Sequence, residues 1–458
     1  MKRTLTLILA ILMLSLPLTS CSPAAGAPGD GSGAVADGGG GLDNGTTNNG
    51  ENDADDVPRD EYGFTIFPDG NYLADPMFDT DDPLPDYDAN NDFILIGNYG
   101  LSGGGLCSTD DTIYYIIQHN EKQTYCTLMY RDKKTGISGP LCGKPECLHN
   151  DRDCNAYIST DKDYLYGLYV YDRKLYLSTG SSVINMELDG TNRGGMGISS
   201  GLFLTNGRVT NSAVPHRGYE YYFGTKYDIT DGVVNETLVV AAQPLDGGEG
   251  FKIIERAVPD NTLCQVRFAG NDVYILVGYP VFLNEIDTVG EIELYRWDSK
   301  TRRSEVLYYG RLDKEDGETF DSFFRNFTVI PKDGIYLQTE HFLYNEEGDE
   351  YGSHHIYDNC GLSRYSFETG DMEHFVWIGS DHGSVEFIRD GKVYSSGYGS
   401  VFVHDLDGNL LLQGELYEPR FSETAGYDDE YIYQRRTFKD GEGYIALPLD
   451  GGAAIILE

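Results

Sequence analysis

The chain has 458 residues and a formal net charge of −40 at neutral pH, with 34 Lys and Arg against 74 Asp and Glu. Binding to nucleic acid depends on clustered Lys and Arg that neutralise phosphates, so this balance argues against a nucleic-acid partner. A strongly acidic surface favours solubility, and it can equally hold divalent cations.

The first element is a short basic region followed by an apolar stretch. Lys2 and Arg3 precede an apolar run over residues 5–18. That run is shorter than the roughly 20 residues of a membrane-spanning helix, and it has the length of the core of a secretory signal peptide. The sequence therefore predicts a signal peptide over residues 1–20.

The end of this stretch, "LTSC" at residues 18–21, resembles the lipobox of bacterial lipoproteins. In that family the cysteine becomes the mature N-terminus and carries lipid, so the resemblance implies that Cys21 is acylated. Each buried methylene adds about 0.8 kcal/mol, so several acyl chains would hold the protein on the extracytoplasmic face of the membrane. The alternative is an ordinary cleaved signal with an incidental cysteine.

A polar linker follows the lipobox. Residues 21–58 are dominated by Gly, Ala, Asp and Asn, and they cannot bury enough apolar surface to fold, which predicts a disordered tether. Residues 59–92 contain aromatic and acidic side chains, and we expect them to pack along the domain that follows.

The acidic stretch "DYDANND" at residues 86–92 is a candidate calcium-binding loop. It places Asp86, Asp88, Asn90 and Asp92 at alternate positions, and this oxygen spacing resembles the start of such a loop. The turn glycine is missing, however, and Gly97 stands where the bidentate Glu belongs. A solvated acidic turn is therefore favoured over a calcium site.

The rest of the chain, residues 93–458, is built from repeated pieces. Seven ranges begin with a polar turn and continue into an aromatic-rich strand: 110–117, 171–178, 217–224, 270–277, 332–339, 389–396 and 427–434. Each is followed by a strand that enters a tight, mostly acidic turn: 128–136, 184–192, 240–248, 294–302, 364–371, 403–409 and 445–452. Asp-Gly and related pairs reach the positive φ of tight hairpin turns, and Tyr, Val, Ile and Leu suit half-buried strands.

Such a unit of short strands, recurring about every 50 residues, is typical of a β-propeller blade. The sequence predicts an all-β fold with a single β-propeller over residues 93–458. Seven blades are favoured because seven pairs of pieces are present, and six or eight remain open because their spacing is uneven.

One repeat resembles a known family. "VINMELDGTNRGG" at residues 183–195 is similar to the strand and turn of the YWTD repeat of low-density-lipoprotein-receptor-type propellers, with the likeness at residues 188–192. Residues 93–458 also resemble exported propeller lipoproteins of Gram-positive bacteria, many of which carry a cysteine-rich segment after their first strands. These resemblances imply a fold and a location, not a reaction.

That cysteine-rich segment, "LCGKPECLHNDRDC" at residues 141–154, brings Cys142, Cys147, His149 and Cys154 close together in sequence. Three thiolates and one imidazole would suit a structural zinc ion, and four protein ligands would leave no open position for catalysis. Close cysteines in an exported protein also commonly form disulfides. With Cys21 acylated, seven cysteines remain, so complete pairing is impossible; disulfide, metal and free thiols all stay open.

Function is the least determined property. The chain contains no phosphate-binding glycine loop or zinc-protease motif, and we assign no catalytic residue. We expect a binding or interaction module, with a carbohydrate or peptide held by the loops at the central channel. The alternatives are a carbohydrate-active hydrolase or lyase on the same fold, and a structural part of a surface complex.

Overall fold

The computed structural model describes residues 58–67, 105–118, 125–159, 165–179, 182–197, 209–230, 233–245, 247–259, 262–282, 288–311, 319–344, 355–379, 384–397, 400–414, 422–438 and 441–457. The expected signal peptide, Cys21, the linker and the possible calcium ligands Asp86, Asp88, Asn90 and Asp92 lie outside these ranges. The described part of the chain contains strands and turns and no helix. It accordingly offers no helix with the length and apolar character needed to cross a membrane.

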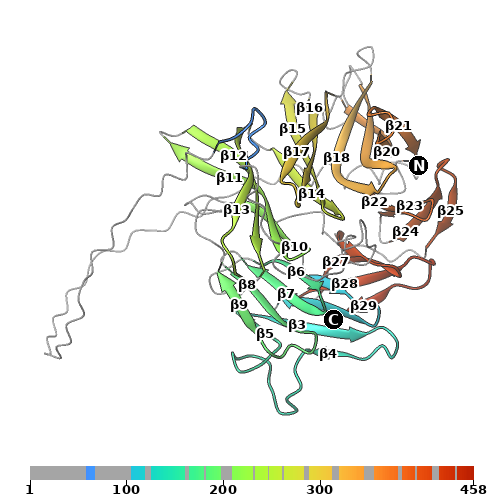
Figure 1. Cartoon of the computed structure of the whole chain (residues 1–458). Helices are drawn as coiled ribbons and strands as arrows, with labels where there is room; N and C mark the ends of the chain where they lie inside the picture. Colours follow the sequence, from blue (N-terminus) through green and yellow to red (C-terminus); the bar gives the residue numbers. More distant parts are fainter. Residues whose placement is uncertain are drawn as a thin grey trace, which may run out of the picture. The chain divides into compact units, whose positions relative to one another are not determined.

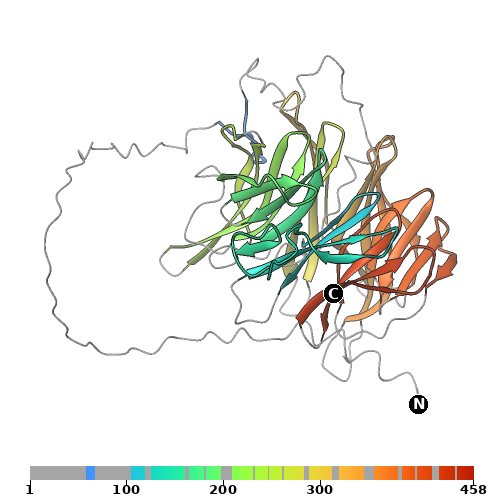
Figure 2. The same ribbon diagram turned by 90° about the horizontal axis from the view of Figure 1, so that it is seen from below.

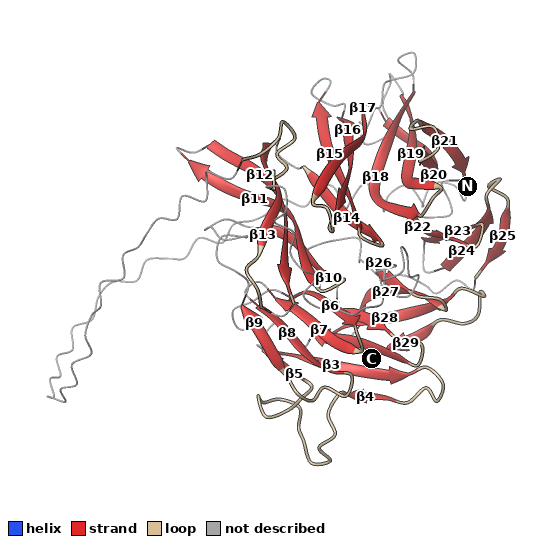
Figure 3. Cartoon of the chain, viewed as in Figure 1, coloured by secondary structure: helices blue, strands red, loops and turns tan. Residues whose placement is uncertain are grey.

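The strands form seven antiparallel sheets, which we number as blades 1 to 7 in chain order (Figures 1 and 3). Blade 1 contains β1 (Leu106–Ser108), β2 (Thr112–Gln118), β3 (Tyr125–Asp132), β4 (Ser138–Pro140) and β5 (Tyr157–Ser159). Blade 2 contains β6 (Leu165–Tyr171), β7 (Lys174–Thr179), β8 (Ser182–Glu187) and β9 (Gly194–Gly197). Blade 3 contains β10 (Val209–His216), β11 (Tyr219–Thr230), β12 (Val233–Pro244) and β13 (Phe251–Val258).

The remaining four blades repeat the same up-and-down order. Blade 4 contains β14 (Leu263–Ala269), β15 (Asp272–Phe282), β16 (Thr288–Asp298) and β17 (Arg303–Arg311). Blade 5 contains β18 (Thr319–Ile330), β19 (Gly334–Tyr344), β20 (His355–Ser366) and β21 (Met372–Trp377). Blade 6 contains β22 (Ser384–Arg389), β23 (Lys392–Gly397), β24 (Ser400–Asp405) and β25 (Leu410–Gln413), and blade 7 contains β26 (Ser422–Tyr427), β27 (Tyr431–Phe438), β28 (Gly441–Pro448) and β29 (Ile455–Leu457).

The predicted all-β propeller with seven blades is confirmed. In every blade the two repeated sequence pieces are the second and third strands, so their turns lie at the same end of the sheet. The turn between β24 and β25 shows why such turns need glycine: Gly408 has φ 83°, and a Cβ there would lie 2.3 Å from the carbonyl oxygen of Trp377. Figure 2 shows the sheets from the side.

The core lies between neighbouring blades and is rich in aromatic side chains. Tyr221 of blade 3 packs on Phe268 of blade 4, with ring centroids 4.9 Å apart. Trp297, Tyr295 and Tyr221 are at most 1% exposed. Burial of a large apolar side chain contributes about 1.5–3 kcal/mol, so these contacts between blades are a main source of stability.

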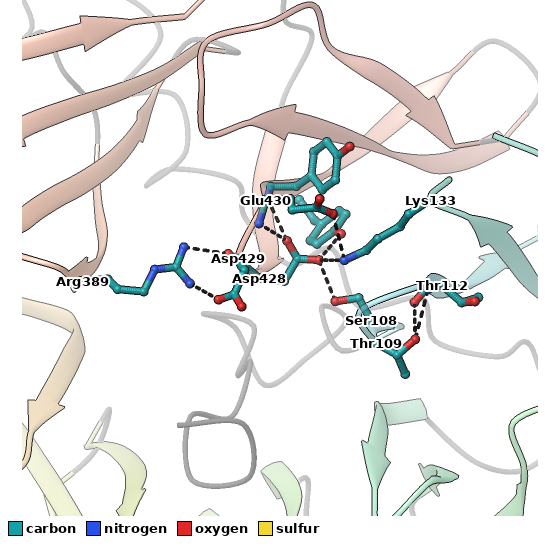
Figure 4. Close-up of polar contacts among 10 residues, drawn as sticks. Ser108, Thr109, Thr112, Lys133, Arg389, Asp428, Asp429 and Glu430 are labelled. Carbon is teal, nitrogen blue, oxygen red and sulfur yellow. Dashed lines mark hydrogen bonds and ion pairs between the residues drawn. The ribbon is translucent and has the colours of Figure 1, made fainter. Parts of the chain in front are cut away.

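Among the described residues, side-chain contacts join the first and last blades, and no described strand is exchanged between them. All described strands of blade 1 come from the start of the repeat region, and all those of blade 7 come from its end. An apolar cluster between them contains Tyr115 of β2 together with Tyr433 and Tyr444 of blade 7. Beside it, Asp428, in the turn between β26 and β27, accepts hydrogen bonds from Ser108 and Lys133 of blade 1 (Figure 4).

Residues 58–67 lie along the outer edge of blade 3, as the blue segment in Figure 1 shows. Phe64 forms an isolated antiparallel bridge with Ile254 of β13, and its side chain is only 2% exposed. The N–H of Thr65 donates to the carbonyl oxygen of Ile253 at 2.9 Å. Arg59 adds an ion pair with Glu255 at 2.8 Å, so this segment extends the sheet by one irregular strand.

Candidate metal centre and inter-blade groove

The cysteine-rich loop interrupts the outermost strand of blade 1. Both β4 and β5 pair with β3, one after the other along the same edge. Leu128 of β3 marks the gap between them: its N–H donates to the carbonyl oxygen of Ala156 at 2.7 Å, and its carbonyl oxygen accepts the N–H of Leu141 at 2.9 Å. The chain therefore leaves the sheet after Leu141 and returns at Ala156.

The loop brings all four predicted ligands together. One ligand atom from each of Cys142, Cys147, His149 and Cys154 lies within 4.8 Å of all the others. His149 Nδ1 is 3.2 Å from Cys154 Sγ. In a tetrahedral zinc site with Zn–S near 2.3 Å and Zn–N near 2.0 Å, the donor atoms are about 3.5–3.8 Å apart, so small shifts of these side chains would complete such a site.

The backbone supports this arrangement. His149 adopts φ 58°, and its N–H donates to Cys147 Sγ at 3.4 Å. The N–H of Ala156 donates to Cys154 Sγ at 3.3 Å. Hydrogen bonds from backbone N–H groups stabilise negative charge on sulfur, as a metal-bound thiolate requires.

The thiols interact strongly with one another. Burial raises the pKa of Cys142, but hydrogen bonds from the Lys144 N–H and from the thiols of Cys154 and Cys147 outweigh this and leave the pKa below its usual value. Burial and the two neighbouring cysteines raise the pKa of Cys154 to about 12. The pKa of Cys142 is thus lowered and that of Cys154 raised within one cluster, and a bound dication would displace the proton of Cys154.

None of the seven described cysteines forms a disulfide. Cys142, Cys147 and Cys154 lie in the cluster, whereas Cys107, Cys126, Cys264 and Cys360 stand in the strands of blades 1, 4 and 5.

The loop also contacts blade 2. Arg193, just before β9, donates to the carbonyl oxygen of Tyr157 at 2.8 Å and to that of Asn155. Gly190 in the preceding turn approaches Leu141 so closely that a Cβ there would lie 3.1 Å from the Leu141 carbonyl oxygen. The centre thus sits where the first two blades meet, at the connection between blades that its place in the sequence, after one hairpin strand and before the next blade, predicts.

A second feature is an open groove between blades 6 and 7, with a volume of about 640 Å³. We call it the 6–7 groove. It is lined by Lys392, Tyr394, Val403, Leu411, Leu412, Asp429, Glu430, Tyr431, Pro448, Leu449 and Asp450. Its volume falls within the range of about 300–1,000 Å³ that is usual for ligand sites. Sequence analysis missed it because the two walls come from different repeats.

Two buried carboxyl groups lie between blades and were also missed. Glu220 of β11 accepts a hydrogen bond from Ser178 of β7 at 2.7 Å, and burial raises its pKa to about 8. Glu386 of β22 accepts hydrogen bonds from Ser396 of β23 and Thr424 of β26 at 2.6 and 2.7 Å, and burial raises its pKa to about 7. Both groups bridge neighbouring blades.

No family model matches the chain, and no curated protein matches its sequence. The resemblance to YWTD repeats therefore stays an expectation.

Among solved structures, a polysaccharide lyase has 9% identity and a TM-score of 0.46, over 76% of this chain and 90% of the lyase. An oligogalacturonate lyase in complex with manganese has 8% identity and a TM-score of 0.42, over 77% and 96% of the two chains. The β-propeller domain of the Trilobed protease from Pyrococcus furiosus, described as having an open velcro topology, has 12% identity and a TM-score of 0.37, over 78% and 97%.

Proposed function

We propose that this chain is a membrane-tethered, extracytoplasmic β-propeller that binds a ligand, and that a structural zinc ion braces its first blade. The observation that carries the zinc assignment is the cluster of four ligand atoms within 4.8 Å, contributed by one loop. The tether is proposed from the lipobox-like residues 18–21.

The donor set argues for a structural ion. Three sulfurs and one imidazole nitrogen fill a tetrahedron, which leaves no position for a substrate or a reactive water. The loop has little apolar surface of its own to bury, because residues 143–153 are exposed or half-buried. Metal binding in zinc-finger peptides contributes on the order of 10 kcal/mol, enough to hold such a loop in place.

A binding role is supported by the 6–7 groove, whose lining combines apolar side chains such as Leu411 and Leu449 with polar ones such as Asp450. Small-molecule and peptide sites commonly have this composition, with a few polar groups that orient the ligand. A carbohydrate or a peptide is the ligand class we propose.

The zinc assignment is tested on the full chain, purified in detergent without chelators. Elemental analysis should give one zinc per chain, and Cys147→Ser should remove it. Cys264→Ser is the matched control, since Cys264 is a free thiol of β14, in another blade. Absence of metal together with a disulfide within the 142–154 loop would replace zinc by the disulfide alternative.

The binding role is tested by glycan and peptide arrays combined with product analysis. Saturable binding without cleavage supports the module. Turnover of a polysaccharide would instead establish a hydrolase or lyase. Failure to bind any array member would favour a structural part of a surface complex, whose partners would copurify with the chain.

A further inference from the structure

Blade 3 carries three basic side chains around a single carboxylate. Glu255 of β13 accepts a hydrogen bond from Arg59 at 2.8 Å through Oε2. Through Oε1 it accepts from Lys226 of β11 at 2.8 Å and from Lys252 of β13 at 2.7 Å. We call these four residues the basic cluster. Because both ammonium groups contact the same oxygen, they are also close neighbours of each other.

The basic cluster has a surplus of positive charge. Burial opposes ionisation of Glu255, but hydrogen bonds from Lys226 and Lys252 outweigh it and hold its pKa below the usual value, so this carboxylate is charged. Three cations against one carboxylate leave a surplus of two positive charges. Within the described ranges, none of the three cations has a second carboxylate at ion-pair distance. Pairing with Glu255 therefore does not neutralise the cluster.

This surplus is held partly out of water. The side chains of Arg59, Lys226 and Lys252 are 21%, 26% and 19% exposed. Charges that are partly desolvated are unfavourable unless an opposite charge compensates them. The acid next in sequence, Asp60, has another role, because its Oδ1 accepts the N–H groups of Tyr62 and Phe64, each at 2.9 Å. A bound anion would supply the missing compensation.

The arginine of the cluster is fixed in place before any ligand binds. The bridge between Phe64 and Ile254 holds the segment of residues 58–67, blue in Figure 1, against β13. Within this segment, Arg59 Nη1 donates to Thr65 Oγ1 at 3.1 Å. A guanidinium presents a planar fork of donors that suits two oxygens of one anion, and ammonium groups add point charges. Donors that are already positioned lower the entropic cost of binding.

We infer that the basic cluster binds an oxyanion with two negative charges, of the phosphate or sulfate type, either as the free ion or as an ester. The charge of such a group matches the surplus of two, since a phosphate monoester carries about −1.5 to −2 at pH 7. The site shares no residue with the zinc centre or the 6–7 groove, so it stands or falls independently of the proposed function.

The test is isothermal titration calorimetry of the full chain in detergent, at about 150 mM sodium chloride to screen longer-range charge. The probes are inorganic phosphate, inorganic sulfate, glucose 6-phosphate and glycerol 3-phosphate. Saturable binding of phosphate and sulfate is expected. It should weaken at least tenfold in the double variant Lys226→Gln and Lys252→Gln, which leaves a neutral pair of Arg59 and Glu255.

The matched control is the double variant Lys134→Gln and Lys174→Gln, which removes two exposed lysines from blades 1 and 2. It should bind phosphate within twofold of the wild type. Phosphate should raise the melting temperature of the wild type and of this control more than that of the cluster variant, because a ligand stabilises the state that binds it. If the cluster variant does not fold, Lys252→Gln alone leaves a surplus of one charge and should weaken binding at least threefold.

Two results would overturn the site: no saturable heat with either inorganic ion, or equal binding by the two double variants. The esters identify the source of the anion. Tighter binding of glycerol 3-phosphate would indicate a lipid headgroup, tighter binding of glucose 6-phosphate a sugar phosphate, and no gain from either ester a free ion. Each of these three results, lost in the cluster variant, would support the assignment.

Discussion

Lys133 Nζ lies 2.9 Å from Asp428 Oδ2, although 295 residues separate the two in the chain. Their side chains are 9% and 11% exposed. Ser108 and Tyr433 donate to the same carboxylate oxygen at 2.7 and 2.5 Å. Because no described strand is exchanged between the first and last blades, this ion pair and the apolar cluster beside it hold the ring closed.

Asp428→Ala should therefore destabilise the fold by about 3 kcal/mol, since it leaves a nearly buried ammonium without its main partner. Chemical denaturation of the full chain measures the change. Asp429→Asn is the control, because that side chain is 83% exposed, and its free energy of unfolding should change by less than about 0.5 kcal/mol. Equal effects of the two variants would contradict the role of Asp428 in ring closure.

The stability that the Lys133–Asp428 contact contributes should depend on pH. Burial opposes ionisation of Asp428, but Lys133, Tyr433 and the N–H of Glu430 outweigh it and hold its pKa below the usual value. A lowered pKa contributes stability above the unfolded-state value of about 3.9, and this contribution is lost as the pH falls through the folded-state pKa. The stability difference between wild type and Asp428→Asn should shrink below about pH 4.

The buried carboxyl group of Glu220 should have the opposite effect on stability: it should make the folded protein less stable as the pH rises. Burial raises the pKa of Glu220 to about 8, against about 4.3 for an unfolded chain. The folded protein then holds a proton that the unfolded chain releases, so stability is highest below the unfolded value and falls as the pH rises toward 8. The slope is about 1.4 kcal/mol per pH unit within that window.

Glu220→Gln should remove this loss of stability at high pH, because an amide does not ionise. Its oxygen can still accept the hydrogen bond from Ser178. Its melting temperature should exceed that of the wild type increasingly from pH 5 to pH 8.5. Glu368→Gln, at an exposed turn, should show no such trend. A constant difference between Glu220→Gln and the wild type would contradict burial as the cause.

Removal of zinc should loosen the cysteine-rich loop and leave the other blades folded. Arg152 is exposed in this loop, between the proposed ligands Cys142 and Cys154. Trypsin should cleave after Arg152 at least tenfold faster after treatment with a chelator or in Cys147→Ser. Mass spectrometry identifies the fragment, and Cys264→Ser provides the unchanged comparison. Cleavage at the same rate with and without metal would argue against a bracing role.

Acylation of Cys21 is tested independently of the fold. A clickable palmitate analogue, fed to cells that express the full chain, should label the protein and place it in the membrane fraction. Cys21→Ala should abolish the label, because no other residue offers the lipobox thiol. Label that persists in Cys21→Ala would contradict the proposed anchor.

Local sequence determined the second and third strands of every blade and the turns beside them. The turn residues around Asp189 and Gly190, and their counterparts in the other repeats, dictate tight hairpins, and the alternating aromatic strands follow from half-burial. These signals depend on neighbours a few residues apart, so the second and third strands could be predicted from the chain alone. Seven blades were favoured on the same signals, but the uneven spacing of the repeats left six or eight open until the sheets were seen. The four candidate ligands Cys142, Cys147, His149 and Cys154 were recognisable for the same reason, because they stand within one loop.

Only the tertiary structure decided how the blades meet. The sequence marks residues 427–434 as a turn and strand, but nothing local indicates that Lys133 pairs with Asp428 and not with another carboxylate. Glu220 and the walls of the 6–7 groove are likewise defined by residues from different repeats. Side-chain contacts between repeats depend on the closure of the ring, and that closure is set by the packing of all seven blades together.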